Sequence, residues 1–166
     1  DPLDPSAPLL AAAVHSEPQQ TLDSLAHARR NGIERFADGS SGGLEITLAE
    51  VKAHTDLSDF GTAESVLAQV QTDGPDPWRV EWYAGLLDLS RNEFVAASKH
   101  FEKVLDALPG ELAPKIALAA SAELITEGIL PSAEEHEKWR VCAETYYRSV
   151  WRTNRAVVSS AFGLAR

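Results

Sequence analysis

The chain has 166 residues, enough for one domain with a hydrophobic core, and 44% of them are apolar and 24% charged, as in ordinary folded proteins. Fifteen basic against 25 acidic residues give a formal net charge of −10. Because nucleic acids and anionic membranes attract clustered Lys and Arg, this charge disfavours both as partners. The longest apolar run, residues 113–125, is too short to span a membrane and contains Pro114 and Lys115.

The cysteine and methionine content bears on the cellular location of the chain and on whether it is part of a longer protein. Cys142 is the one cysteine, so it cannot form an internal disulfide, and the first residues show no basic leader before an apolar run. Both observations favour a reducing, cytoplasmic location. The chain contains no methionine, so we expect it to be an internal piece of a longer protein.

Residues 1–43 predict a linker followed by a helical segment that packs on what comes after it. Three prolines in residues 1–8 indicate an extended linker, and residues 9–14 suit a short helix. Thr21 is the expected cap of a helix that ends near Arg30. The glycine- and serine-rich residues 37–43 are typical of a loop.

A 34-residue period follows. Similar side chains recur at this spacing in five pairs: Phe60 and Phe94, Ala63 and Ala97, Leu67 and Phe101, Val70 and Val104, and Pro75 and Pro109. This is the period of the tetratricopeptide repeat (TPR), a pair of helices that must stack on further copies to bury its apolar face. The period therefore predicts an all-α fold, a TPR superhelix of antiparallel helix pairs. An irregular helical bundle with accidental periodicity is the alternative.

The repeats can be bounded from this period. We expect repeat 1 at 44–77, repeat 2 at 78–111 and repeat 3 at 112–157. The second helix of repeat 1 would carry apolar residues from Phe60 to Val70 and end at Gly74-Pro75, because proline lacks the N–H that a helix needs. Residues 158–166 would begin a fourth repeat that is cut off.

Repeat 3 departs from the period. Ala143 and Tyr147 correspond to Ala97 and Phe101 after 46 residues instead of 34, which predicts a 12-residue insertion. We place this insertion at 126–137 and expect it to project as a loop. Ser132 and Glu135 form a capping box that would start the next helix.

Each recurring position in the period has an expected structural role. Small residues should allow the two helices of a pair to approach, an aromatic residue should fill the gap between a pair and its neighbour, and proline should end the second helix. The positions with such roles are Phe60, Ala63, Leu67, Pro75, Gly85, Phe94, Ala97, Phe101, Pro109, Ala143 and Tyr147.

The search for catalytic chemistry finds no constellation. His136 lies in an acidic run, residues 134–137, but Arg140 stands where a His-Glu-x-x-His metal motif would need its second histidine. Nothing in the sequence is placed to lower the pKa of Cys142. We predict no cofactor and no enzymatic activity, with a helical metal-dependent enzyme that uses the His136 cluster as the alternative.

The remaining candidate for function is the surface that the predicted helices would expose. In a TPR stack the first helix of each pair lines a concave groove, and arginine and large aromatic side chains are favoured anchors in protein interfaces. Trp82 could equally serve in packing between repeats. The predicted groove residues are Glu45, Lys52, Arg79, Trp82, Leu86, Leu89, Ile116 and Ala120.

Three blocks carry a resemblance to a known family: Gln20–Leu25, Leu108–Lys115 and Ser159–Arg166. Together with Trp82-Tyr83 and the run Val150–Asn154, their order and spacing resemble the C-terminal TPR region of the PknG family of actinobacterial soluble serine/threonine kinases. The chain departs from the family in its longer segment at 126–137.

The resemblance implies a parent protein with a rubredoxin-like metal module, a kinase domain and then this region. Such kinases phosphorylate a regulator with a forkhead-associated (FHA) domain that tunes 2-oxoglutarate and glutamate metabolism. Their TPR region is implicated in dimerisation and substrate engagement, so the implied partners are the kinase domain of the same chain, a second copy or the FHA substrate. None of the kinase motifs is present in this sequence. An autonomous TPR adaptor is the alternative.

Overall fold

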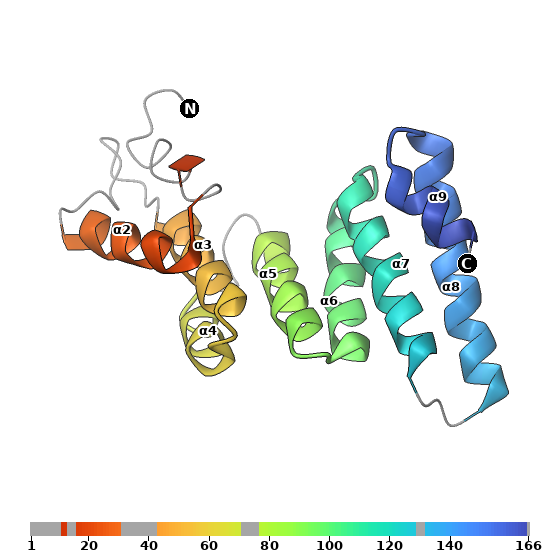
Figure 1. Ribbon diagram of the computed structural model, residues 1–166, viewed down its shortest axis with the longest axis horizontal. Helices are drawn as coiled ribbons and strands as arrows, with labels where there is room; N and C mark the ends of the chain where they lie inside the picture. The colour runs from red at the N-terminus through yellow and green to blue at the C-terminus, as the bar shows by residue number, and fades with distance from the viewer. Residues whose placement is uncertain (1–10, 13–15, 31–42, 71–76, 129–131, 166) are drawn as a thin grey trace. The chain divides into compact units, whose positions relative to one another are not determined.

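The structure, a computed structural model, describes residues 11–12, 16–30, 43–70, 77–128 and 132–165 (Figure 1). Every regular element within these ranges is an α-helix, so the predicted all-α class is confirmed. The labelled helices are α2 (Pro18–Arg30), α3 (Gly43–Asp56), α4 (Phe60–Leu67), α5 (Pro77–Ser90), α6 (Phe94–Ala107), α7 (Leu112–Glu127), α8 (Ala133–Thr153) and α9 (Val158–Ala165).

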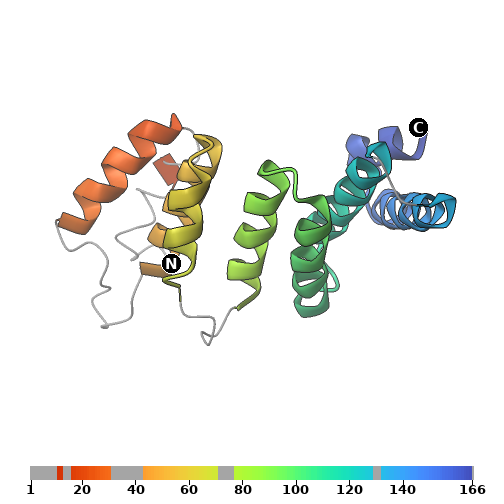
Figure 2. The ribbon, with the colours of Figure 1, turned by 90° about the horizontal axis from the view of Figure 1, so that it is seen from below.

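The chain divides into two compact units, and the boundary falls inside α5. Unit 1 covers Asp1–Tyr83 and unit 2 covers Ala84–Arg166. In unit 1, α2 packs on α3 and α3 packs on α4 (Figure 2). In unit 2, α6 packs on α7, α7 on α8 and α8 on α9. Within each unit, helices that follow one another in sequence thus pack together, as in a stack of helical repeats.

The turn between the two helices of a pair has the same backbone conformation in repeats 1 and 2. Ser58 and Asn92, which are 34 residues apart, have φ angles of 60° and 64°. In each turn, two N–H groups donate hydrogen bonds to carbonyls at the end of the first helix. In repeat 1 these are Ser58 N to Thr55 O at 2.9 Å and Asp59 N to His54 O at 2.9 Å. In repeat 2 they are Asn92 N to Leu89 O at 3.1 Å and Glu93 N to Asp88 O at 2.8 Å. This pattern is the Schellman motif, so the period is present in the backbone as well as in the side chains.

The close approach of α5 and α6 explains a glycine at position 85. A Cβ atom built on Gly85 would lie 2.6 Å from Cε1 of Phe101, and the Phe101 side chain is fully buried. We expected Phe101 to fill the gap between neighbouring helix pairs. The contact with Gly85 instead places its ring against the first helix of its own pair.

Most of the predicted structural positions are buried, and the rest lie at the edges of the helices. The buried ones are Ala63, Gly85, Ala97, Phe101, Ala143 and Tyr147; the half-buried ones are Phe60, Leu67 and Phe94; Pro109 is exposed in the turn after α6; and Pro75 lies outside the described residues.

The helix that we expected Thr21 to cap begins one turn earlier than predicted. Helix α2 starts at Pro18, and the N–H of Thr21 already bonds the carbonyl of Glu17 at 3.0 Å. Proline suits the first position of a helix because its missing N–H would have no partner there. Thr21 is therefore a buried residue of the helix that packs toward α3, and not its cap.

The second helix of repeat 1 is shorter than predicted. Helix α4 ends at Leu67, and tight turns follow, with the N–H of Gln69 and of Val70 bonded to carbonyls three residues back. Val70 therefore lies outside the helix. The expected stop at Gly74-Pro75 lies outside the described residues.

The insertion in repeat 3 is largely helical, so the prediction of a projecting loop is wrong for most of its length. Helix α7 continues to Glu127, and α8 begins at Ala133 and is 21 residues long, against 14 for α6. The Ser132 side chain accepts a hydrogen bond from the N–H of Glu135 at 3.1 Å, as its capping motif predicts. This cap, with acidic residues in the first turn, stabilises the additional turns of α8.

We predict that Ser58→Gly raises the free energy of unfolding by about 0.5–1 kcal/mol. A serine at positive φ has a crowded Cβ atom, a cost of about 1 kcal/mol that glycine avoids. Asn92→Gly should have a smaller effect, because asparagine tolerates this conformation better. Urea denaturation of the 166-residue chain measures both, and a loss of stability in Ser58→Gly would contradict the assigned turn.

We further predict opposite signs for two glycine-to-alanine changes. Gly85→Ala should lower stability by about 1–2 kcal/mol, because overpacking against Phe101 outweighs the helix propensity of alanine. A Cβ atom at Gly61, in α4, would have no atom within 4 Å other than those of its chain neighbours and its own helix backbone, so Gly61→Ala should raise stability by up to about 1 kcal/mol. Thermal denaturation distinguishes them; a neutral Gly85→Ala would show that α5 and α6 approach less closely.

Candidate protein-binding surfaces

In unit 1 the structure brings together two of the predicted groove residues. Glu45 on α3 and Arg79 on α5 occupy equivalent positions 34 residues apart, and their side chains form an ion pair. The Arg79 guanidinium also lies over the ring of Trp78, 5.3 Å from its centroid, in cation–π contact. Burial raises the pKa of the neighbouring Tyr83 and Glu45 raises it further, while Arg79 opposes the shift. The sequence pattern did not reveal the aromatic neighbours Trp78 and Tyr83.

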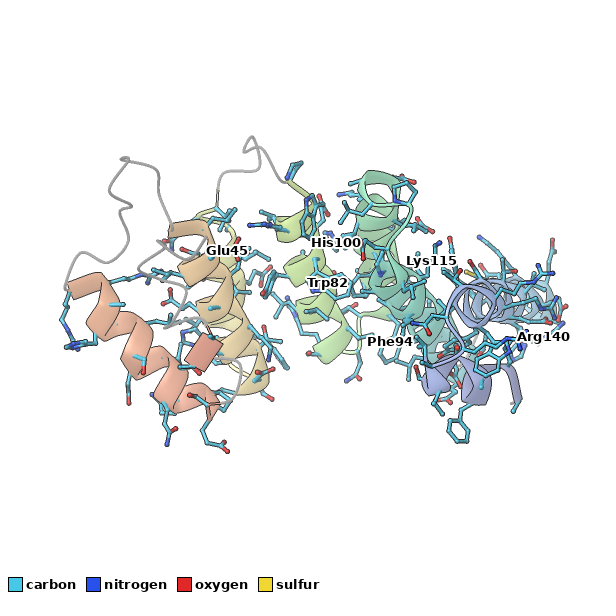
Figure 3. All side chains as sticks on the ribbon, turned by 90° about the horizontal axis from the view of Figure 1, so that it is seen from above. Glu45, Trp82, Phe94, His100, Lys115 and Arg140 are labelled. Carbon is cyan, nitrogen blue, oxygen red and sulfur yellow. The ribbon has the colours of Figure 1, made fainter. Side chains whose placement is uncertain are left out.

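Two other predicted groove residues of unit 1 differ in exposure. Lys52 is exposed on α3 and pairs with Asp56 one turn later on the same helix. Trp82 is half-buried on α5 (Figure 3). A half-buried tryptophan retains apolar area that a partner can cover, whereas an exposed lysine offers a charge.

In unit 2 the predicted groove residues are apolar. Leu86 and Leu89 lie on α5, and Ile116 and Ala120 lie on α7, four residues apart and thus on one helix face. All four are half-buried. The eight predicted groove residues are therefore divided between the two units, four in each.

A pocket of about 400 Å³ lies between α7, α8 and α9, and the sequence pattern did not predict it. The residues that line it are Glu123, Thr126, Glu127, His136, Arg140, Ala143, Glu144, Tyr147, Gly163 and Leu164. Several belong to the additional turns of α7 and α8, so the length of the insertion was the available signal. The helical conformation of those turns could not be inferred from length alone.

Tyr147 connects the three helices that form this pocket. Its hydroxyl donates a hydrogen bond to Oε2 of Glu123 on α7 at 2.8 Å. Its ring lies so close to Gly163 of α9 that a side chain there would overlap it. The ring and hydroxyl of one buried side chain thus contact α9 and α7 respectively.

Arg140 is held on the surface of α8 by its own helix (Figure 3). Its Nε and Nη2 atoms donate to the two carboxylate oxygens of Glu137 at 2.8 and 2.6 Å, and Nη1 lies 3.6 Å from Glu144. Hydrogen bonding from Arg140 lowers the pKa of Glu137. Glu144 also pairs with Arg148 one turn later, so charges of alternating sign run along this face.

The two candidate reactive side chains of the sequence are placed differently. His136 is exposed near the start of α8, and the described part of the chain brings no three His, Cys, Asp or Glu side chains into an arrangement that could hold a metal ion. Cys142 is half-buried. Burial raises the pKa of its thiol, and the Glu102 carboxylate adds to the shift against the opposing Lys138.

Comparison with known proteins decides the family. The Protein kinase G tetratricopeptide repeat family matches residues 1–166. The chain belongs to the PknG TPR family. It is 43% identical over all 166 residues to the serine/threonine-protein kinase PknG of Mycobacterium leprae, and 39% identical to that of Mycolicibacterium smegmatis.

The match covers a limited part of those relatives. The chain spans about a fifth of the length of each of these two PknG kinases. The resemblance identified from the sequence blocks is thus confirmed for this region. No helix among the described residues is both long and apolar enough to cross a membrane.

We predict that Cys142 reacts slowly with iodoacetamide near neutral pH. Its raised pKa keeps the thiol protonated, and only the thiolate is a nucleophile. The rate in the folded chain should be lower than in urea and should continue to rise beyond about pH 8.5, where an ordinary cysteine titrates. A rate that reaches its plateau at a lower pH would instead indicate an activated thiolate.

Proposed function

We propose that this chain is a non-catalytic docking region of a PknG-type serine/threonine kinase, and that it binds a second copy of itself or a protein substrate. The observation that carries the proposal is the identity of 39–43% to two PknG kinases across the whole chain. TPR stacks bury their helices against one another and leave the faces of the first helices for partners. An adaptor unrelated to kinases would not account for this identity.

The side chains of α5 support a role in binding. Trp82 and Arg79 belong to the residue types that most often anchor protein interfaces. Arg79 is oriented by Glu45 and Trp78 before any partner arrives, so little side-chain entropy remains to be lost on binding. The proposed groove therefore contains an ordered cation and a half-buried tryptophan on the same helix.

The wider activity is inferred from the family. We propose that the parent protein is an ATP-dependent kinase, that its substrate is the FHA-domain regulator of 2-oxoglutarate metabolism, and that it acts in the cytoplasm. In this arrangement the present chain contributes binding energy, because a docking contact remote from the reacting atoms increases the local concentration of the substrate.

We predict that Trp82→Ala in the parent kinase lowers kcat/KM for the FHA-domain protein about tenfold, the effect of losing about 1.4 kcal/mol of binding energy. A short peptide substrate that cannot reach the groove should be phosphorylated at an unchanged rate. If the groove serves self-association, sedimentation velocity should show a loss of dimer instead.

Lys52→Glu is the second variant, because an exposed side chain can be changed without unfolding the chain. Lys99→Glu, also exposed but on α6, is its matched control and should change neither kcat/KM for the protein substrate nor the oligomeric state. A folded Trp82→Ala and a Lys52→Glu that leave both the protein-substrate kinetics and the oligomeric state unchanged would contradict the docking proposal.

A further inference from the structure

We propose that the pocket between α7, α8 and α9 binds an arginine or lysine side chain from a basic segment of a partner protein. This inference rests on the proposed docking function and adds the chemistry of one partner. It concerns residues different from those of the predicted groove.

The pocket depends on the helical insertion. Thr126 and Glu127 come from the last turn of α7, and His136 and Arg140 come from the first turns of α8. Thr126, Glu127 and His136 belong to the insertion that the 34-residue repeat does not require, whereas Arg140 corresponds to Phe94 at the start of α6. The 12 additional residues therefore extend two neighbouring helices and thereby form the walls of a hollow that an ordinary repeat would lack.

Small residues and one aromatic ring line part of the pocket. Ala143 and Gly163 contribute no long side chain, and the ring of Tyr147 lies against Gly163. The hydrogen bond from the Tyr147 hydroxyl orients the carboxylate of Glu123. A volume of about 400 Å³ lies in the range of pockets that hold small ligands, so it has room for one long side chain.

The lining carries an excess of negative charge. Three carboxylates, those of Glu123, Glu127 and Glu144, stand against one guanidinium, that of Arg140. Arg140 makes its two short hydrogen bonds to Glu137, which is not part of the lining. Glu144 is already paired with Arg148 and lies 3.6 Å from Nη1 of Arg140, so an incoming cation would meet chiefly the carboxylates of Glu123 and Glu127.

The charge of the whole chain favours the same class of partner. At a formal net charge of −10 it repels phosphorylated peptides and nucleic acids and accelerates the approach of cations. Charge complementarity of this kind selects partners and increases association rates. A basic peptide segment is thus the occupant that the pocket and the surface both favour.

The test is a titration of the ¹⁵N-labelled 166-residue chain with blocked hexa-arginine, followed by NMR at about 0.15 M salt, where the screening length is about 8 Å. We expect resonance shifts confined to the end of α7, the beginning of α8 and α9. Hexa-citrulline, which has the same shape without the charge, should not produce them.

The variants locate the binding site. The double variant E123Q/E127Q should weaken binding about five- to tenfold, as expected for the loss of two partly exposed charge pairs. Glu111→Gln removes one such charge at the opposite end of α7, about 24 Å from Glu127 along the helix axis, and should leave the affinity unchanged. Glu127→Lys is a single change at an exposed position, so it should reduce binding without unfolding the chain.

Three results would overturn the proposal: shifts spread over the whole acidic surface, equal weakening by Glu111→Gln, or a pocket that responds to Zn²⁺ and not to the arginine peptide. The outcome is independent of the docking experiments on Trp82 and Lys52, because those residues belong to unit 1. If hexa-arginine does not bind but Trp82→Ala still lowers kcat/KM or dimerisation, the proposed pocket function is wrong and the docking proposal stands.

Discussion

The ring of Phe101 occupies the space in which a side chain at position 85 would lie, and this approach of two helices is the constraint on which the repeat depends. A helix pair of this length buries little apolar surface unless its two members approach closely and then stack on neighbouring pairs. A glycine on one helix and an aromatic ring on the other satisfy that requirement. Gly163 and Tyr147 repeat the arrangement between α9 and α8, with the glycine following the ring in sequence.

The turns between helices position the second helix of each pair against the first. A left-handed residue at Ser58 and again at Asn92 reverses the chain direction at the same point of each pair, so the second helix returns along the first. The ion pair between Glu45 and Arg79 has the same 34-residue spacing. Backbone conformation, hydrophobic contacts and charge pairing therefore follow one period, and this agreement between levels is characteristic of sequences that specify one structure.

The same architecture explains where binding surfaces can arise. Within a repeat, most apolar side chains are used for packing, so free surface remains on helix faces and at points where the period is broken. The insertion at 126–137 is such a point. By making α7 and α8 longer than the helices of repeat 2, it forms a hollow lined by charged side chains beside the apolar core of this unit.

The sequence by itself determined the helical class, the 34-residue period and the family, because these depend on residue types at fixed spacings. It also located the cap at Ser132, a local hydrogen bond between residues close in the chain. The repeat register predicts the groove residues, and this remains a prediction; it did not indicate that Trp78 lies against Arg79 or that Tyr83 lies near it.

Only the tertiary structure decided how far each helix extends and what its additional turns form. Local conformational preference competes with packing by distant residues at three places. These are the end of α4 at Leu67, the helical insertion, and the contact of Tyr147 with both Glu123 and Gly163. A sequence pattern contains the local preference but not the distances between helices. For this reason the period predicted a stack of helices, whereas the pocket between α7, α8 and α9 became visible only in three dimensions.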